Sequence, residues 1–393
     1  MLFYESLALT LVVYLVLRGL GRGFATRRGT FAYFALTLVV YGPWLLSRIW
    51  GIHFRTGVAW VAGTWVFGCL LTFAIGLPLL LAKGILRLVR AFSKSRAAQG
   101  VESVEGRRQF LGNVALPVMA LSLGGVGAVG GASSFILAKR EIFIRGWPKD
   151  LDGFRIGQIT DTHVGDFIDP ETVARAVEVL NHAQVDLQVM TGDLVDDLKY
   201  LEQTFQALDT CLARHGMLAV LGNHEKMHHR LGPTLQAYAR RREAGHLRLL
   251  VDEREALLHN GSPLHVIGVD FPMHNNANHY LPRSDRQQLM NVSAKRAFPQ
   301  ERPAGEALLC LSHHPDFFPL AAKRGAHLTL SGHTHGGQIA IGGNPIFSTY
   351  DYMLGHYQIS DSHLYVSGGT GHWLPVRYGV PTEVTVITVR AHG

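Results

Sequence analysis

The sequence predicts an α/β (α+β) domain preceded by an all-α transmembrane region. Residues 1–140 carry 15 Lys and Arg against 3 Asp and Glu, while residues 141–393 carry 22 against 27. The first part contains long uncharged stretches. The second part alternates short apolar runs with helical ones and holds 20 of the 21 histidines. We therefore predict a membrane region at 1–140 and a separate domain at 141–393.

Composition excludes two broad classes of protein. Hydrophobic residues make up 47% of the chain and charged residues 17%, whereas a soluble domain has about 25% charged residues. A disordered chain is excluded by this balance. The pI of about 9.4 reflects the membrane region alone, because residues 141–393 carry a net charge of −5. No nucleic-acid partner is expected for them.

Four stretches of the first region are candidates for membrane helices. A bilayer core about 30 Å thick is crossed by roughly 20 helical residues. The predicted spans are 2–20, 30–48, 58–82 and 110–137, and the lipid bilayer is their expected partner. In the first span, Glu5 and Arg18 lie near the ends, where charged groups reach the interface.

The charges between these spans predict an orientation. The three loops carry four, two and seven Lys or Arg in chain order, and positively charged loops stay in the cytoplasm. The expected localisation is a multi-pass cell-membrane protein with residues 141–393 outside the cytoplasm. Residues 107–111 resemble a twin-arginine export signal or are the basic flank of an ordinary membrane helix. If residues 109–138 lie along the surface instead, the domain stays inside.

The second region begins with alternating strands and helices and continues with further strands. Alternation of this kind indicates βαβ units, whose ligands collect at the carboxyl ends of the strands. Helices are predicted at 170–183 and 200–212. Strands are predicted at 154–160, 187–191, 217–221, 264–269, 307–312, 326–331, 364–367 and 384–389.

Five of these strands end in side chains that bind metals. The motifs, in chain order, are Asp161-x-His163, Gly192-Asp193, Gly222-Asn223-His224-Glu225, His313-His314-Pro315 and Gly332-His333-x-His335. Two divalent ions about 3.5–4 Å apart share a bridging carboxylate, and imidazole and amide groups complete their coordination. Cysteine is absent from the set, which argues against a structural zinc site.

This ordered series resembles the signature of the calcineurin-like metallophosphoesterases, over about residues 150–390. Residues 336–338, 374–379 and 383–384 resemble a bacterial branch that is membrane-anchored or exported. The resemblance implies a four-layer αββα metallophosphoesterase sandwich with two mixed sheets between helices. It also implies a hydrolase acting on phosphoric ester bonds that uses two divalent metal ions, of Mn, Fe, Zn or Co.

The resemblance also implies a role for each matching residue. Asp161, His163 and His335 would bind the first metal, and Asp193 would bridge the two. Asn223, His313 and His333 would hold the second metal. His224 would contact the substrate and protonate the leaving oxygen, a role suited to imidazole near neutral pH. His313 matches the ligand position better than His314, and His228 and His229 are candidates for substrate contact.

The substrate is expected to be a small-molecule or lipid-linked phosphoester. The resemblance permits a phosphodiester, phosphomonoester or pyrophosphate, and a membrane anchor favours an envelope or lipid-linked substrate. The alternative is a pyrophosphatase of the UDP-2,3-diacylglucosamine type facing the cytoplasm. Two other classes are disfavoured. A regulated transporter would carry ionisable groups within its spans, and an inert binding module would have lost ligands. The sequence does not indicate the oligomeric state.

Overall fold

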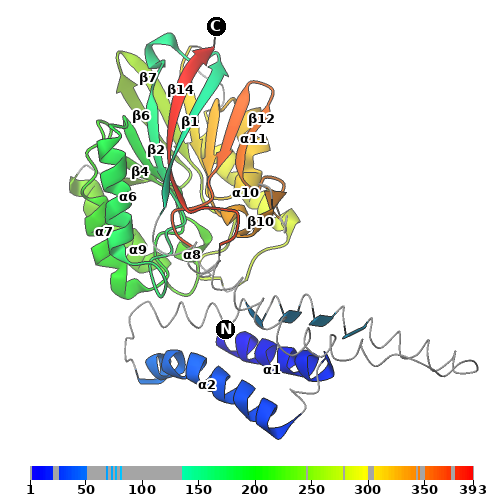
Figure 1. Ribbon diagram of the computed structural model, residues 1–393. Helices are drawn as coiled ribbons and strands as arrows, with labels where there is room; N and C mark the ends of the chain where they lie inside the picture. The colour runs from blue at the N-terminus through cyan, green and yellow to red at the C-terminus, as the bar shows by residue number, and fades with distance from the viewer. Residues whose placement is uncertain are drawn as a thin grey trace, which may run out of the picture. The chain divides into compact units, whose positions relative to one another are not determined.

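The computed structural model describes residues 2–20, 26–50, four residue pairs between 68 and 81, 135–244, 247–277, 279–299, 305–341, 344–345, 350–372 and 377–392. The chain forms two compact units, of which the second comprises residues 133–373 and 377–393. Figure 1 shows the elements of both units in chain order.

The first unit contains two long helices, α1 (Leu2–Leu20) and α2 (Arg27–Trp50). They coincide with the first two predicted spans. Their contact is aromatic, with the ring of Tyr14 lying 5.5 Å from Tyr33 and 5.0 Å from Phe34. Among the described residues, no helix combines the length and the apolar character required to cross a membrane. Of the predicted span 58–82 only the four residue pairs are described, and of the span 110–137 only residues 135–137 are described.

The second unit is built on two six-stranded sheets. The first sheet has the order β1-β14-β2-β3-β4-β5. Strands β2, β3, β4 and β5 run parallel to one another, and β14 is antiparallel to β2. The bounds are β1 Ile136–Arg145, β2 Arg155–Ile159, β3 Leu187–Met190, β4 Met217–Ala219, β5 Leu247–Leu249 and β14 Glu383–His392.

The second sheet has the order β12-β13-β9-β8-β7-β6. Its centre is parallel, from β13 through β9 and β8 to β7, and both edge pairs are antiparallel. The bounds are β6 Glu253–His259, β7 Ser262–Gly268, β8 Ala307–Leu311, β9 Leu328–Ser331, β12 Gly355–Ile359 and β13 Ser362–Val366. A short hairpin of β10 (Ala340–Ile341) and β11 (Asn344–Pro345) follows β9 in the chain.

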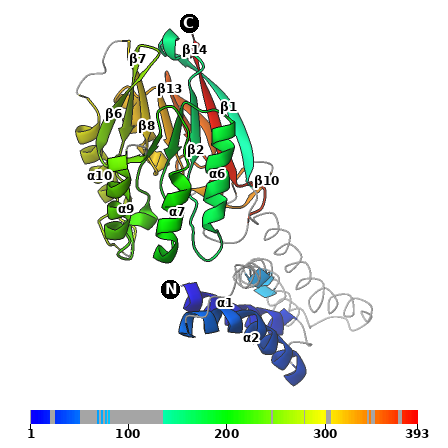
Figure 2. The same ribbon diagram turned by 90° about the vertical axis from the view of Figure 1, so that its left-hand side faces the viewer.

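Helices cover the outer face of each sheet: in Figure 1, α6, α7 and α9 lie on one side of the strands and α10 and α11 on the other, and Figure 2 looks onto α6, α7 and α9. The first sheet packs on α6 (Pro170–His182), α7 (Leu201–Leu208) and α9 (Leu231–Ala244) through a core that includes Val177 and Phe205. The second packs on α10 (Arg283–Ala297) and α11 (Phe318–Lys323). A third core joins the inner faces, with Leu187 and Leu218 of one sheet against Leu309 and Leu330 of the other. The second unit therefore has the predicted αββα layers.

Several predicted boundaries are wrong. Strand β1 starts at Ile136, before the predicted boundary at 141, and it takes the last two residues of the predicted span 110–137. It was missed because apolar residues precede it without a break and its own sequence is charged, as expected for a sheet edge. The helix predicted at 200–212 ends at Leu208, where Asp209 begins a turn.

Short elements were missed for a related reason. Strands β5, β6 and β12 and helices α9, α10 and α11 have exposed, polar or very short sequences whose periodicity is weak. Their pairing with neighbouring strands or their packing on a sheet decides their conformation, and neither is visible in a local sequence window.

Candidate active site

The predicted ligands follow strand ends that meet at one edge of the two sheets. Asp161 follows β2, Asp193 follows β3, Asn223 follows β4, and His313 and His333 follow β8 and β9. A hydrogen bond of 3.0 Å from Gln158 Nε2 to the carbonyl of Ser331 joins β2 to the end of β9. The parallel strands therefore bring together side chains that are up to 174 positions apart in the chain.

The backbone at these strand ends is strained. Asp161, His163, Asp193, His333 and His335 have φ values of 53°, 48°, 57°, 74° and 49°, in the left-handed region. Non-glycine residues seldom adopt this conformation, which costs about 1–3 kcal/mol each and concentrates at functional sites. The surrounding sheets hold the turns in place, so the strain points to a function for these five side chains.

Two glycines allow the turns to approach the carboxylates. A Cβ at Gly222 would lie 2.1 Å from Asp193 Oδ1, and a Cβ at Gly332 would lie 2.1 Å from Asp161 Oδ2. Any side chain at either position would displace a predicted ligand.

The first cluster consists of Asp161, His163 and His335, whose candidate ligand atoms lie within 4.8 Å of one another. His335 Nε2 is 3.3 Å from Asp161 Oδ1 and 3.0 Å from His163 Nε2. The backbone N–H of His333 donates to both oxygens of Asp161 at 3.0 Å, and the Thr160 hydroxyl donates to Oδ2 at 2.7 Å. All three side chains are buried.

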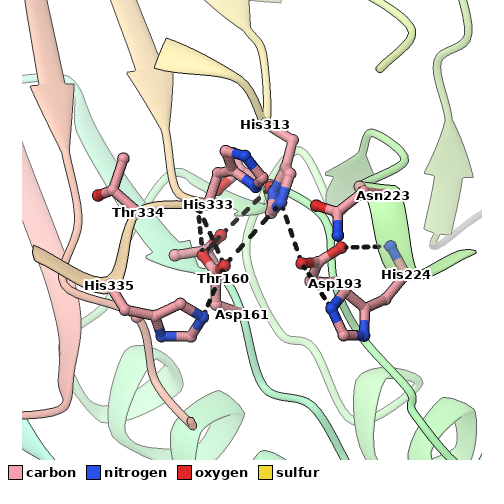
Figure 3. Close-up of polar contacts among 12 residues, drawn as sticks. Thr160, Asp161, Asp193, Asn223, His224, His313, His333, Thr334 and His335 are labelled. Carbon is pink, nitrogen blue, oxygen red and sulfur yellow. Dashed lines mark hydrogen bonds and ion pairs between the residues drawn. The ribbon is translucent and has the colours of Figure 1, made fainter. Parts of the chain in front are cut away.

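The second cluster consists of Asp193, His313 and His333, again within 4.8 Å. Asp193 Oδ2 is 3.2 Å from His313 Nε2 and 3.7 Å from His163 Nε2, so this carboxylate faces both clusters. Figure 3 shows His335 beside Asp161 and His224 beside Asp193, with His313 and His333 between the two carboxylates.

The donor atoms of the second cluster fit a cation. Within the part of the chain that the structure describes, Oδ1 of Asn223 and Nε2 of His313 are buried without a hydrogen-bond partner. The other ring nitrogen of His313 donates to the carbonyl of Thr191 at 2.6 Å, so Nε2 is the ring nitrogen that can offer a lone pair to a cation once its proton is lost. Buried polar atoms of native proteins are almost always satisfied. A divalent cation would satisfy both of these atoms.

His224 lies beside Asp193 and, like His333, is partly exposed, whereas His163, His313 and His335 are buried. Its side chain is 23% exposed, its backbone N–H donates to Asp193 Oδ1 at 2.8 Å, and its Nδ1 lies 2.5 Å from Asp196 Oδ1. Burial lowers the pKa of His224, but the carboxylates of Asp193 and Asp196 outweigh it and raise the pKa to about 9. A protonated imidazole at the opening of the site can donate a proton to a bound molecule.

The two carboxylates at the centre have opposite electrostatic environments. Burial raises the pKa of Asp161, and His313 and His163 offset this only in part. Burial also opposes ionisation of Asp193, but His313 and His224 outweigh it and hold its pKa well below the usual range. Burial lowers the pKa of His314 to about 3. Its Nδ1 accepts the backbone N–H of Asp316, so His314 caps a turn, while His313 faces the carboxylates as predicted.

Four groups around the clusters were missed as functional candidates. Asp196 contacts Nδ1 of His163 at 3.3 Å as well as His224. Glu225, fully buried, accepts backbone N–H groups from Asp193, Leu194 and Gly222 at 3.0, 2.6 and 2.7 Å. Asp196 lies three residues after Asp193, and Glu225 directly follows His224. This closeness to predicted site residues is the sequence signal that could have found them.

The third missed group is Arg377, and the fourth is a pair of tyrosines, Tyr280 and Tyr350. Arg377 donates to Nδ1 of His335 at 2.8 Å and to the carbonyl of Gly368 at 2.6 Å. The tyrosine hydroxyls contact Asn223 and His333. Arg377 lies in the stretch 374–379 that carries the family resemblance, but no role was predicted for it. No local pattern marks the two tyrosines, because loops between distant elements bring them to the site. His228 and His229 are exposed and have left-handed φ values of 51° and 63°.

Comparisons with known proteins indicate the same class of protein as the site residues do. The model of the calcineurin-like phosphoesterase family matches residues 154–337. The uncharacterized metallophosphoesterase YkuE of Bacillus subtilis (strain 168) is 29% identical over 299 residues, which cover 72% of this chain and 98% of that protein. An uncharacterized metallophosphoesterase of Helicobacter pylori (strain ATCC 700392 / 26695) is 28% identical and is covered over 58% of its length.

A vertebrate protein is also similar. The transmembrane protein with metallophosphoesterase domain of Danio rerio is 26% identical over 342 residues, which cover 82% of this chain and 72% of that protein. Together with the strand-end clusters, these matches identify residues 154–337 as a calcineurin-like phosphoesterase domain. It is a metallophosphoesterase, a hydrolase of phosphoric ester bonds.

Proposed function

We propose that this protein is a membrane-anchored phosphoesterase that depends on two divalent metal ions. The observation that carries the proposal is the arrangement of the seven predicted ligands. Two clusters of donors are close together, and the Asp193 carboxylate of the second faces His163 of the first at 3.7 Å. Asp193 and His163 also form a group with His224. Among the described residues, Oδ1 of Asn223 and Nε2 of His313 are buried without a hydrogen-bond partner.

The assignment of ligands follows from the clusters. Asp161, His163 and His335 would hold the first ion, and His313 and His333 the second, with Asp193 between them. Asn223 would complete the second set, because its buried Oδ1 has no hydrogen-bond partner among the described residues. Imidazole and carboxylate donors accommodate Mn, Fe, Zn or Co. When bound, the ions would supply Lewis-acid activation of the phosphoryl group and of the attacking water.

The side chains of the protein would supply orientation and a proton. The His224 side chain is 23% exposed and its Nδ1 is 2.5 Å from Asp196, which fixes the direction of its ring. Its Nε2 would carry the proton to the leaving oxygen of the phosphoester. Glu225 would keep the Asp193 turn rigid through its three backbone hydrogen bonds, so that the bridging carboxylate does not move during the reaction.

Two observations support the membrane anchor. Leu11, Leu15, Phe31, Leu38 and Val39 on the first two helices are exposed, while Thr10 and Thr37 are buried. The Tyr33 hydroxyl donates to the carbonyl of Thr10 at 2.9 Å, so polar contacts lie inside the pair. This pattern is typical of helices surrounded by lipid. In addition, a match covering 82% of the chain includes about 70 residues before position 141, and that relative is named a transmembrane protein.

The proposed substrate is an envelope or lipid-linked phosphoester, because an anchored enzyme meets such molecules at high local concentration. The loop charges favour a site outside the cytoplasm. A cysteine introduced near Gly393 and tested with a membrane-impermeant thiol reagent in intact protoplasts checks this side. Reaction before lysis supports the outward site. Reaction only after lysis overturns it and favours the cytoplasmic pyrophosphatase of the UDP-2,3-diacylglucosamine type.

Turnover tests the enzymatic proposal directly. Purified full-length protein loaded with Mn²⁺ should hydrolyse bis(p-nitrophenyl) phosphate or p-nitrophenyl phosphate, and a chelator should abolish this activity. Two bound ions per chain without hydrolysis of any phosphodiester, monoester or pyrophosphate would contradict a catalytic role and indicate a binding module.

A further inference from the structure

Two tyrosine hydroxyl groups reach the second cluster from different loops. Tyr280 lies between β7 and α10, and its hydroxyl accepts a hydrogen bond from Nδ2 of Asn223 at 2.8 Å. Tyr350 precedes β12, and its hydroxyl lies 2.9 Å from Nε2 of His333. Both contacts are therefore made to side chains that we propose as ligands of the second ion.

The Tyr280 contact decides which end of the Asn223 amide faces the cluster. An amide has a donor end and an acceptor end, and only its oxygen is suited to a hard or borderline cation. Because Nδ2 is engaged by Tyr280, Oδ1 is directed elsewhere, and it is the atom that is buried without a partner among the described residues. Figure 3 shows this oxygen pointing toward the side of the site where His313 lies.

The Tyr350 contact plays the same part for an imidazole ring. With Nε2 of His333 engaged by the hydroxyl, Nδ1 is the ring nitrogen left for coordination. The ring itself is packed between aromatic neighbours, at 5.2 Å from Phe271 and 4.9 Å from Tyr350, centroid to centroid. Packing alone would hold the ring plane, but it would not select between the two nitrogens.

The other ligands are held by groups of a different kind. His313 donates to the backbone carbonyl of Thr191, His163 contacts the Asp196 carboxylate, and His335 contacts the Arg377 guanidinium. The tyrosines thus act on two members of the second cluster, and their contacts with the ligands are neutral hydrogen bonds.

We infer that Tyr280 and Tyr350 are positioning residues for the second metal ion, because their hydroxyls present Oδ1 of Asn223 and Nδ1 of His333 to it. The inference rests on the proposed dinuclear site. Partners that orient metal ligands typically change metal affinity by about 10- to 100-fold when they are removed. Loss of either hydroxyl should therefore weaken the second ion selectively and leave the first unchanged.

The test is a stepwise Mn²⁺ titration of metal-free, full-length protein, followed by calorimetry and by the metal content after gel filtration. The wild type should bind two ions per chain. Tyr280→Phe and Tyr350→Phe should each keep the first affinity and weaken the second about 10- to 100-fold. Matched controls are Tyr378→Phe, since Tyr378 is exposed to the same degree as Tyr280 (45% and 47%), and Tyr365→Phe, whose buried hydroxyl donates to Glu383 at 3.0 Å.

A double-mutant comparison separates orientation from general destabilisation. A carboxylate presents an oxygen whichever way it is turned, so Tyr280→Phe should have a smaller effect on the second affinity in an Asn223→Asp background than in the wild type. A purely structural role for Tyr280 would give the same loss in both backgrounds, and that result would overturn the inference.

The outcomes distinguish this inference from the proposed function. If the wild type binds two ions and both tyrosine variants bind the second as tightly as the controls do, the positioning role is wrong and the dinuclear site stands. If the wild type does not bind a second ion, the dinuclear site fails, and the role of the tyrosines fails with it.

Discussion

The two clusters of the candidate site differ in what holds their ligands. In the first, charged groups contact the imidazoles: Asp196, whose side chain is 27% exposed, lies 3.3 Å from His163, and the buried Arg377 lies 2.8 Å from His335. In the second, a backbone carbonyl contacts His313, and tyrosine hydroxyls contact Asn223 and His333. Hydrogen bonds to charged groups are roughly twice as strong as neutral ones.

This difference predicts two ions of unequal affinity. The three ligand side chains of the first cluster are buried. The second includes His313, whose pKa is raised in the metal-free protein, and a partner, Tyr280, that is exposed. We expect the first ion to bind more tightly and the second to exchange with solvent. The Asp193 carboxylate should couple the binding of the two ions, because it faces both clusters.

The largest expected effect comes from removing the shared charge. Asp193→Asn should leave the fold intact but abolish hydrolysis, because the bridging carboxylate is lost from both clusters. Circular dichroism checks the fold, and turnover and metal content are measured on the same sample. Turnover close to that of the wild type with two bound ions would rule out the dinuclear arrangement.

Replacing the proton donor should affect only the chemical step. We expect His224→Ala to lower turnover by roughly 10²- to 10⁴-fold, the range of general acid catalysis, and to leave metal content near normal. Loss of an ion in this variant would instead make His224 a ligand, as its distance of 4.0 Å from Asp193 Oδ2 allows.

The first cluster can be weakened separately through its arginine. Arg377→Lys keeps the positive charge but cannot replace all the contacts to His335 and the carbonyl of Gly368. The first ion should bind about 10- to 100-fold more weakly. Unpaired carbonyl groups should also lower the free energy of unfolding by about 1–3 kcal/mol. If the titration showed weaker binding of the second ion only, Arg377 would not act on the first cluster and the proposed difference between the clusters would be wrong.

A smaller effect is expected from pH. In the metal-free protein, burial lowers the pKa of His313, but Asp193 and Asp161 outweigh it and raise the pKa to about 9. Below that value an ion must displace a proton, so the affinity of the second cluster should rise up to about tenfold per pH unit between pH 7 and 9. Burial and Arg377 hold the pKa of His335 well below its usual range, so this proton competition is absent there. If the affinities for both ions changed equally with pH, the predicted difference between the two clusters would be wrong.

Sequence patterns predicted the centre of the site better than its surroundings. Asp161 and Asp193 follow apolar strands of the first sheet and His313 follows one of the second, so a strand assignment was enough to place each at the carboxyl end of its strand. Tyr280, Tyr350 and Arg377 come from loops whose path depends on the packing of whole elements. The αββα layering could be expected because it follows from the family resemblance. The edge strand β1 could not be found, because its own sequence is charged.

The central claim is that two unequal ions act together, and a single titration tests it most directly. Metal-free wild-type protein receives Mn²⁺ in steps, and hydrolysis of bis(p-nitrophenyl) phosphate is measured at each step beside the bound metal. We predict that the first equivalent binds without producing activity, and that activity rises with the second and stops rising at two ions per chain. Full activity at one ion per chain would contradict the account.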